Sequence, residues 1–86
     1  MENYLEILLE VNPDILLCDG LEDALIGFVE VQGKTVALYD SQRCIEIFQE
    51  RDGMTEEEAF EYFSFNVAGA YMGENTPAFA TLFRRK

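Results

Sequence analysis

The sequence predicts a small single α+β domain, in which an antiparallel sheet packs with an N-terminal helix and an αα-hairpin. The chain has 86 residues, the length of one domain. Hydrophobic residues make up 49% of it, including seven Phe and four Tyr, which is far from a disordered composition. Helix-like and strand-like hydrophobic periods also follow one another along the chain, and each is taken in order below.

Residues 4–11 have the apolar spacing of an amphipathic helix. The apolar stripe consists of Tyr4, Leu5, Leu8, Leu9 and Val11, and Glu2, Glu6 and Glu10 recur on the other side. Asn12-Pro13 should end this helix, because the residue before a proline is disfavoured in the α region. A short apolar run at 15–18 and a turn at Asp19-Gly20 follow.

Residues 25–39 give the clearest strand pattern of the chain. Apolar side chains alternate on both sides of Gln32-Gly33-Lys34, where the glycine supplies the positive φ of a hairpin turn. Gly27 inside the first strand suggests a bulge or a close backbone approach.

Two helices joined by a very short link are expected next. Asp40 or Ser41 caps the first, and Gly53 is suited to its left-handed C-terminal cap. Thr55 and Glu58 form a capping box at the start of the second. The predicted buried faces carry Cys44, Ile45, Ile47 and Phe48 in the first helix and Ala59, Phe60, Phe63 and Val67 in the second.

The last strand is expected at residues 79–83. Phe79, Thr81 and Phe83 alternate there with Ala80 and Leu82, after a loop that follows Gly73. With the hairpin, this strand completes the predicted sheet. An exposed final strand can pair edge to edge with a second copy, so a homo-oligomer is a candidate state.

The charge excludes several partners. Seventeen acids face six bases, which gives a net charge of −11, and no Lys or Arg precedes Lys34. Such a field repels nucleic-acid phosphates and anionic membranes, so we expect neither direct nucleic-acid binding nor membrane binding. The acidity serves either solubility alone or attraction to a basic surface. Arg84-Arg85-Lys86 is either a frayed terminus or a partner for phosphate or a sister subunit's acids.

Localisation is expected to be cytoplasmic. The chain begins with acids where a signal peptide carries bases, and no apolar run approaches the roughly 18 residues of a membrane span. Cys18 and Cys44 have no C-x-x-C spacing, which favours buried free thiols over a single disulfide.

Missing residue types exclude most catalytic and cofactor chemistry. The chain has no histidine, which removes Ser-His, Cys-His and His-metal mechanisms. Glycine-rich nucleotide loops are absent from the sequence, and the residues around Gly53 do not fit the register of a calcium-binding loop. Cys44 lacks a base nearby in the sequence. We therefore expect no cofactor and no catalytic residues.

Polar residues at element ends supply one candidate site. Asp19, Glu22 and Asp23 either form a solvated turn or hold a metal ion or a shared proton. Asp40, beside Tyr39, either caps a helix or orients a ligand. Residues 66–77 are either an irregular helix end or a pocket lining. The predicted binding residues are Asp19, Gly20, Asp23, Tyr39, Asp40, Asn66, Gly69, Tyr71, Gly73, Glu74 and Thr76.

An ordered series of motifs marks a resemblance to a known family. The series is Asp19-Gly20, Asp23-Ala24, Ala37-x-Tyr39-Asp40, Cys44-Ile45-Glu46, Gly53-Met54-Thr55-Glu56-Glu57-Glu58-Ala59 and Phe65-Asn66-Val67-x-Gly69-Ala70-Tyr71-x-Gly73-Glu74-x-Thr76-Pro77. Over about residues 19–80 the chain resembles a widespread family of small proteins of unassigned function from phages, prophages and their bacterial hosts. The resemblance implies a mobile-element setting in a bacterial host cell and no particular reaction.

Three functions stay open at this point. The first is a non-catalytic phage-type accessory protein, a candidate counter-defence factor that binds a small polar, nucleotide-derived ligand or a host protein. The second is an acidic inhibitor that imitates nucleic acid through Glu2, Glu6, Glu10 and residues 56–58. The third is a metal-dependent hydrolase that uses Asp19, Asp23 and Glu74.

Overall fold

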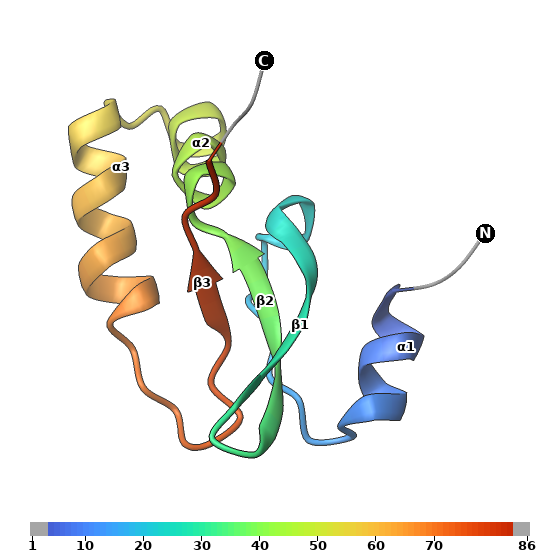
Figure 1. The fold of residues 1–86 in the computed structure, drawn as a ribbon. Helices are drawn as coiled ribbons and strands as arrows, with labels where there is room; N and C mark the ends of the chain where they lie inside the picture. Colours follow the sequence, from blue (N-terminus) through green and yellow to red (C-terminus); the bar gives the residue numbers. More distant parts are fainter. Residues whose placement is uncertain (1–3, 84–86) are drawn as a thin grey trace.

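A computed structural model describes residues 4–83 around a three-stranded sheet with the strand order β1-β2-β3 (Figure 1). The strands are β1 (Leu25–Val31), β2 (Lys34–Asp40) and β3 (Ala78–Ala80). β1 and β2 pair antiparallel, as predicted, and the α+β class is confirmed. β3 instead pairs parallel with β2, so the sheet is mixed. The long connection through α2 (Ser41–Asp52) and α3 (Glu56–Tyr62) brings the chain back to the end of the sheet from which β2 also starts. A parallel pair of strands requires such a crossover.

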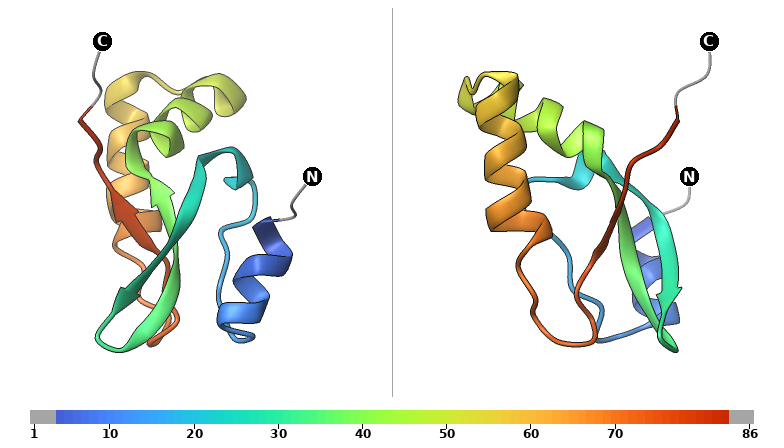
Figure 2. Two further views of the ribbon diagram at one scale, coloured as in Figure 1. Left: turned by 45° about the vertical axis from the view of Figure 1, so that its right-hand side comes forward. Right: turned by 60° about the vertical axis from the view of Figure 1, so that its left-hand side comes forward.

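Three helices and two shorter helical segments accompany the sheet. They are α1 (Tyr4–Val11), the 3₁₀ turn η1 (Glu22–Ala24), α2 (Ser41–Asp52), α3 (Glu56–Tyr62) and the π-helical segment η2 (Phe63–Ala68), which continues α3. α2 and α3 lie together at one end of the sheet, and α1 lies apart from them (Figures 1 and 2). None of the described helices combines the length and apolar character needed to cross a membrane.

Local sequence signals account for the hairpin and the helix ends. Gln32 and Gly33 both have positive φ, 51° and 81°, which is the two-residue turn that matches the twist of a hairpin. A bulge interrupts the register between Leu25 and Gly27. α2 ends at Gly53 in the left-handed region, and Thr55 forms the predicted capping box with Glu58.

The core lies between β2, α2, α3 and the loop before η1. Its buried side chains are Leu8, Ile15, Leu21, Ala24, Ala37, Tyr39, Cys44, Ile45, Ile47, Phe48, Ala59 and Phe63. The predicted buried face of α2 is confirmed. Phe60 is a wrong prediction, because its side chain is 57% exposed. Ala59 and Phe63 face the core four residues apart, and the next position points about 100° away.

The two ends of the chain pack less tightly than predicted. Leu8 is the buried residue of α1, whereas Tyr4, Leu9 and Val11 are exposed. The radius of gyration is 13.3 Å, above the about 12 Å typical of this length. β3 ends at Ala80 rather than at residue 83, and Phe83 is 99% exposed. Residues 84–86 lie outside the described part of the chain.

Asn12 joins three segments that are far apart in the sequence. Its side chain is almost fully buried just after α1. Its amide nitrogen donates to the Thr35 carbonyl of β2 at 2.8 Å and to the Asn75 side chain at 2.9 Å, in the loop before β3. Its side-chain oxygen accepts from the Asp14 amide at 3.0 Å. Both the side-chain nitrogen and the side-chain oxygen of Asn12 are therefore bonded within the fold.

We predict that Asn12→Ala lowers the free energy of unfolding by about 1–3 kcal/mol, since it leaves buried polar groups without partners. Urea unfolding followed by circular dichroism measures this loss. Asn66→Ala is the matched control, because Asn66 is exposed and its loss should change stability by less than about 0.5 kcal/mol. Equal effects of the two substitutions would contradict the bridging role of Asn12.

Candidate functional site

A cleft of about 350 Å³ lies between the loop at residues 16–21, the α3–η2 helix and the segment before β3. We call it the loop cleft. Apolar side chains form most of its walls, among them Leu17, Phe48, Val67 and Met72. Three charged or amide side chains also line it, namely Asp19, Arg51 and Asn66. Concave sites with this combination of apolar walls and few polar groups are typical of ligand pockets.

The π-helical turn of η2 shapes one wall of the loop cleft. Such turns bulge the helix backbone and are frequent at functional sites. Gly69 closes this segment, and a Cβ atom there would lie 2.9 Å from the Ser64 carbonyl oxygen. A side chain at this position would therefore displace backbone atoms. The fold itself thus requires a glycine at the predicted site residue Gly69. Gly69 does not line the cleft.

Tyr39, predicted to contact a ligand, lies in the core instead. Its side chain is 1% exposed, and its hydroxyl accepts a hydrogen bond from the Cys18 amide at 2.8 Å. Its ring lies 5.7 Å from that of Phe79, which in turn contacts Phe63 edge to face at 5.2 Å. Tyr39 thus fixes the loop that carries Cys18 and Asp19 to the centre of the sheet. Sequence reasoning missed this because a tyrosine at a strand end has the same pattern whether it faces a ligand or the core.

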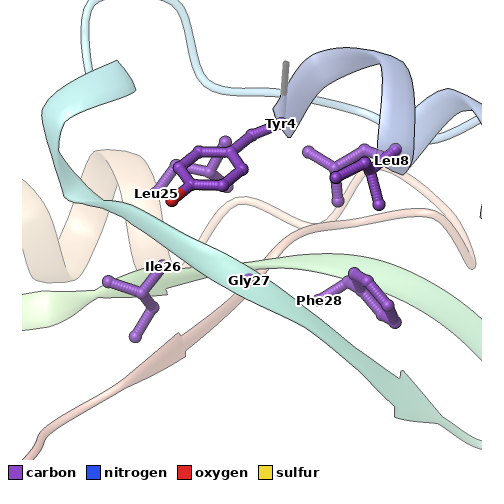
Figure 3. A pocket seen from close by; sticks show the side chains of 7 residues that line it. Tyr4, Leu8, Leu25, Ile26, Gly27 and Phe28 are labelled. Carbon is purple, nitrogen blue, oxygen red and sulfur yellow. The ribbon is translucent and has the colours of Figure 1, made fainter. Parts of the chain in front are cut away.

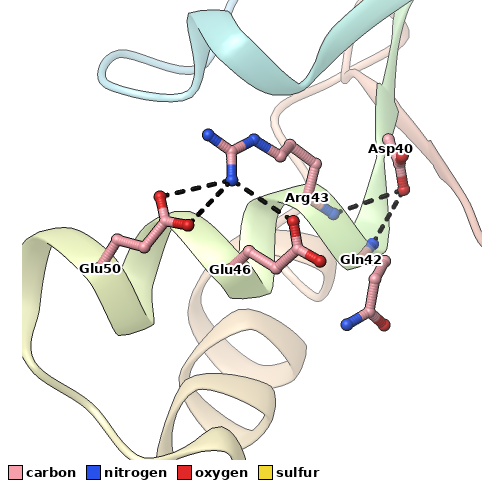
Figure 4. Close-up of polar contacts among 5 residues, drawn as sticks. All are labelled: Asp40, Gln42, Arg43, Glu46 and Glu50. Atoms are coloured by element: carbon pink, nitrogen blue, oxygen red, sulfur yellow. Dashed lines mark hydrogen bonds and ion pairs between the residues drawn. The ribbon is translucent and has the colours of Figure 1, made fainter.

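Asp40 is the N-cap of α2, one of its two predicted roles. Its carboxylate accepts from the amides of Gln42 at 3.0 Å and Arg43 at 3.4 Å (Figure 4). Nearby, Arg43 pairs with Glu46 and Glu50 at 3.3 Å on the surface of α2. Asp40 does not line the loop cleft.

Of the predicted residues in the Asp19 turn, only Asp19 lines the loop cleft. Gly20 has a φ of 85°, and its carbonyl accepts from the Arg51 guanidinium at 3.3 Å. Asp23 is exposed in η1. Within residues 4–83, no three His, Cys, Asp or Glu side chains are grouped so that they could hold a metal ion. The proposed set of Asp19, Asp23 and Glu74 is therefore not assembled as a metal site.

Residues 66–77 divide between the cleft and the loop that follows it. Asn66 lines the cleft and Tyr71 is exposed. The Thr76 hydroxyl accepts from the Met72 amide at 2.7 Å and donates to the Gly73 carbonyl at 2.6 Å, which closes the loop. Glu74 pairs with Lys34 at 3.8 Å beside the β-hairpin turn. Gly73, Glu74 and Thr76 shape this loop and do not line the cleft.

Arg51 is the site residue that sequence reasoning missed. It lies in the last turn of α2, and its guanidinium stacks over Phe48 with 5.5 Å to the ring centroid. A hydrogen bond to Asp52 raises its pKa, so it stays a cation. Arg51 and Gly20 are 31 positions apart in the sequence, so no local sequence pattern predicts that their groups form a hydrogen bond.

The Cys18 thiol lies in the cleft wall and is half-buried. Burial raises its pKa above the ordinary value, although a hydrogen bond with Tyr39 lowers it in part. The thiol is therefore protonated at neutral pH, which disfavours a nucleophilic role. Both cysteines are free, as predicted.

A second cleft of about 360 Å³ adjoins the first. Tyr62 and Asn66 line both, so the two clefts share one wall on the α3–η2 helix. Phe65 lines the second cleft and is 79% exposed, and Glu58 and Glu61 supply its acidic edge. Together, the clefts form one partly aromatic surface.

The acids named for nucleic-acid imitation do not share a surface. Glu6 and Glu10 lie on α1, whereas residues 56–58 begin α3 at the far end of the molecule (Figure 1). Glu58 also bonds the Thr55 amide in the capping box at 2.9 Å. Glu2 lies outside the described residues.

We predict that stability falls at alkaline pH. Burial raises the pKa of Tyr39 from 10.0 to about 12 and that of Cys44 from 9.0 to about 12. Since the unfolded chain loses these protons first, the contribution of these two groups to the free energy of unfolding is constant below about pH 9 and falls between about pH 9 and 12. Each group contributes a slope of up to about 1.4 kcal/mol per pH unit, which urea unfolding across this range measures.

Tyr39→Phe should flatten this slope above about pH 10 and also lower stability near neutral pH, because the Cys18 amide loses its acceptor. Tyr71→Phe is the matched control and should leave the curve unchanged, since Tyr71 is exposed. A curve that does not respond to Tyr39→Phe would refute the buried hydroxyl contact.

Comparisons with known proteins found no match for this chain. No protein-family model, no curated protein and no solved structure matches the chain. The resemblance to the phage, prophage and bacterial family therefore stays a prediction from the sequence motifs.

Proposed function

We propose that this protein is a binding protein that takes a flat ring with a polar edge into the loop cleft. The observation that carries the proposal is the lining itself, in which mostly apolar walls surround Asp19, Arg51 and Asn66. A cleft of about 350 Å³ suits a small ligand, since ligand pockets span roughly 300–1,000 Å³. The polar groups would then fix the orientation of the ring.

Nucleosides are the ligand class that this lining fits best. An amide such as that of Asn66 can donate to and accept from the edge of a base. Asp19 supplies an acceptor, and Arg51 supplies a cation whose charge is already shared with Asp52. With a net charge of −11, the chain disfavours several phosphates on the ligand. We therefore favour a neutral nucleoside, or a singly charged derivative, over a polyphosphate.

The motif resemblance supplies the biological setting of the proposal. In that setting, the protein is a non-catalytic phage-type accessory factor in the cytoplasm of a bacterial host cell. Removal of a nucleotide-derived signal from a host defence pathway would make it a counter-defence factor. The acidic-mimic alternative has less support, because the acids of α1 and of the start of α3 lie at opposite ends of the molecule.

We predict that adenosine, guanosine, cytidine or uridine shifts the amide resonances around Asp19, Asn66 and Met72 in a two-dimensional NMR titration. ATP, with its additional charge, should bind more weakly than adenosine. Asn66→Ala should weaken binding about five- to tenfold, the equivalent of one hydrogen bond. Raising the salt concentration should change the affinity for the neutral nucleosides little.

Gln32→Ala is the control for this titration, because Gln32 lies in the exposed hairpin turn. It should bind as the wild type does. The proposal fails if none of the four nucleosides shifts these resonances, or if Asn66→Ala binds a nucleoside as tightly as Gln32→Ala.

A further inference from the structure

A third and larger cavity, independent of the other two, lies between α1 and β1. This α1–β1 groove has a volume of about 470 Å³ and is lined by Tyr4, Ile7 and Leu8 on one side and by residues 25–28 on the other. Tyr4 and Leu25 both line the groove, and the lining side chains are almost entirely carbon (Figure 3). Tyr4 is 69% exposed and Phe28 is 47% exposed, so the groove is open to a partner.

An acidic side chain lies beside the α1–β1 groove, and two more are on the outer face of α1. Glu30 is exposed on β1, two residues beyond the lining residue Phe28, whereas Glu6 and Glu10 are exposed on the side of α1 that faces away from the groove. Within residues 4–83, none of these three takes part in a salt bridge. The first base in the sequence is Lys34, which is paired with Glu74. A partner that fits this groove therefore combines an apolar group with positive charge.

The C-terminal segment of the chain has this combination. Leu82 is exposed and Phe83 is almost fully exposed, so neither contributes to the core. Arg84-Arg85-Lys86 follows directly and holds three of the six bases in the chain. β3 leads into this segment from the opposite edge of the sheet to β1, so Leu82 and Phe83 lie away from the groove of their own chain.

We propose that the α1–β1 groove binds the C-terminal segment of a second copy of this chain. Phe83 enters the groove between Tyr4 and Phe28, and the bases that follow it lie against Glu30. Because each copy carries both a groove and a segment, two reciprocal contacts close a twofold dimer. The basic segment offsets the repulsion between two strongly acidic chains.

The contact area sets the expected strength. An aromatic side chain buries about 150–250 Å². Two reciprocal contacts of an aromatic and a leucine fall below the roughly 800 Å² per partner of a standard interface. The dimer should therefore be weak, depend on protein concentration and loosen as salt screens its charged part.

Sedimentation equilibrium of the full chain over a range of concentrations tests the pairing. The wild type should shift from monomer to dimer as concentration rises. Phe83→Ala should weaken dimerisation at least about tenfold and cannot unfold the core, since Phe83 is 99% exposed. Phe65→Ala is the matched control, because it removes another exposed phenylalanine far from the groove and should leave the dimer intact.

A charge exchange identifies the surfaces that meet. Arg84→Glu with Arg85→Glu should weaken the dimer, and so should Glu30→Arg. An equimolar mixture of these two variants should recover association, because both contacts of the mixed dimer again pair opposite charges. A wild type that stays monomeric at all concentrations would overturn the proposal. A dimer that survives Phe83→Ala, or a mixture without recovery, would overturn it as well.

Discussion

The burial of one hydroxyl group, that of Tyr39, constrains the rest of the fold. A tyrosine on the central strand of a sheet brings a polar oxygen into the core, where it must find a hydrogen-bond partner. That partner is the Cys18 amide, so the loop between α1 and β1 must pass close to β2. The ring also contacts Phe79, which contacts Phe63. One side chain therefore links the loop, the last strand and the end of the αα-hairpin.

Those three linked segments are also the ones that border the loop cleft. Four of the residues that line the cleft belong to these segments. Cys18 and Asp19 lie in the loop, Val67 lies one helical turn beyond Phe63, and Pro77 precedes β3. The cleft is therefore a consequence of the core and not a separate addition to it, which gives it a preformed shape. Preformed sites avoid part of the ordering cost of binding. The α1–β1 groove differs in this respect, because α1 contributes a single buried side chain.

Sequence reasoning was most successful where one local pattern decides the structure. The capping box at Thr55, the left-handed Gly53 and the positive-φ turn at Gly33 each follow from chemistry within a few residues. Contacts between segments that are distant in the sequence could not be predicted in this way. Neither the parallel pairing of β3 nor the meeting of Arg51 with Gly20 has a local signal.

For the same reason, the structure brings together only some of the residues that were predicted to form the site. The structure brings Asp19 and Asn66 into one cleft, although 47 positions separate them in the sequence. Tyr39 and Asp40 have polar groups at a strand end, which suggests ligand contact, but the fold uses both for its own hydrogen bonds. Thr76 and Gly73 likewise close a loop. Polar residues at element ends serve caps and turns as readily as ligands, and only the three-dimensional arrangement separates the two uses.

Native-state hydrogen exchange of the Cys18 amide tests most directly whether Tyr39 holds the cleft together. If the hydroxyl contact fixes the loop to the core, this amide opens only when the whole domain unfolds, and its exchange free energy equals that of global unfolding. Exchange of the Cys18 amide as fast as that of exposed loop amides would show that the loop moves independently of the sheet. The cleft would then not be preformed.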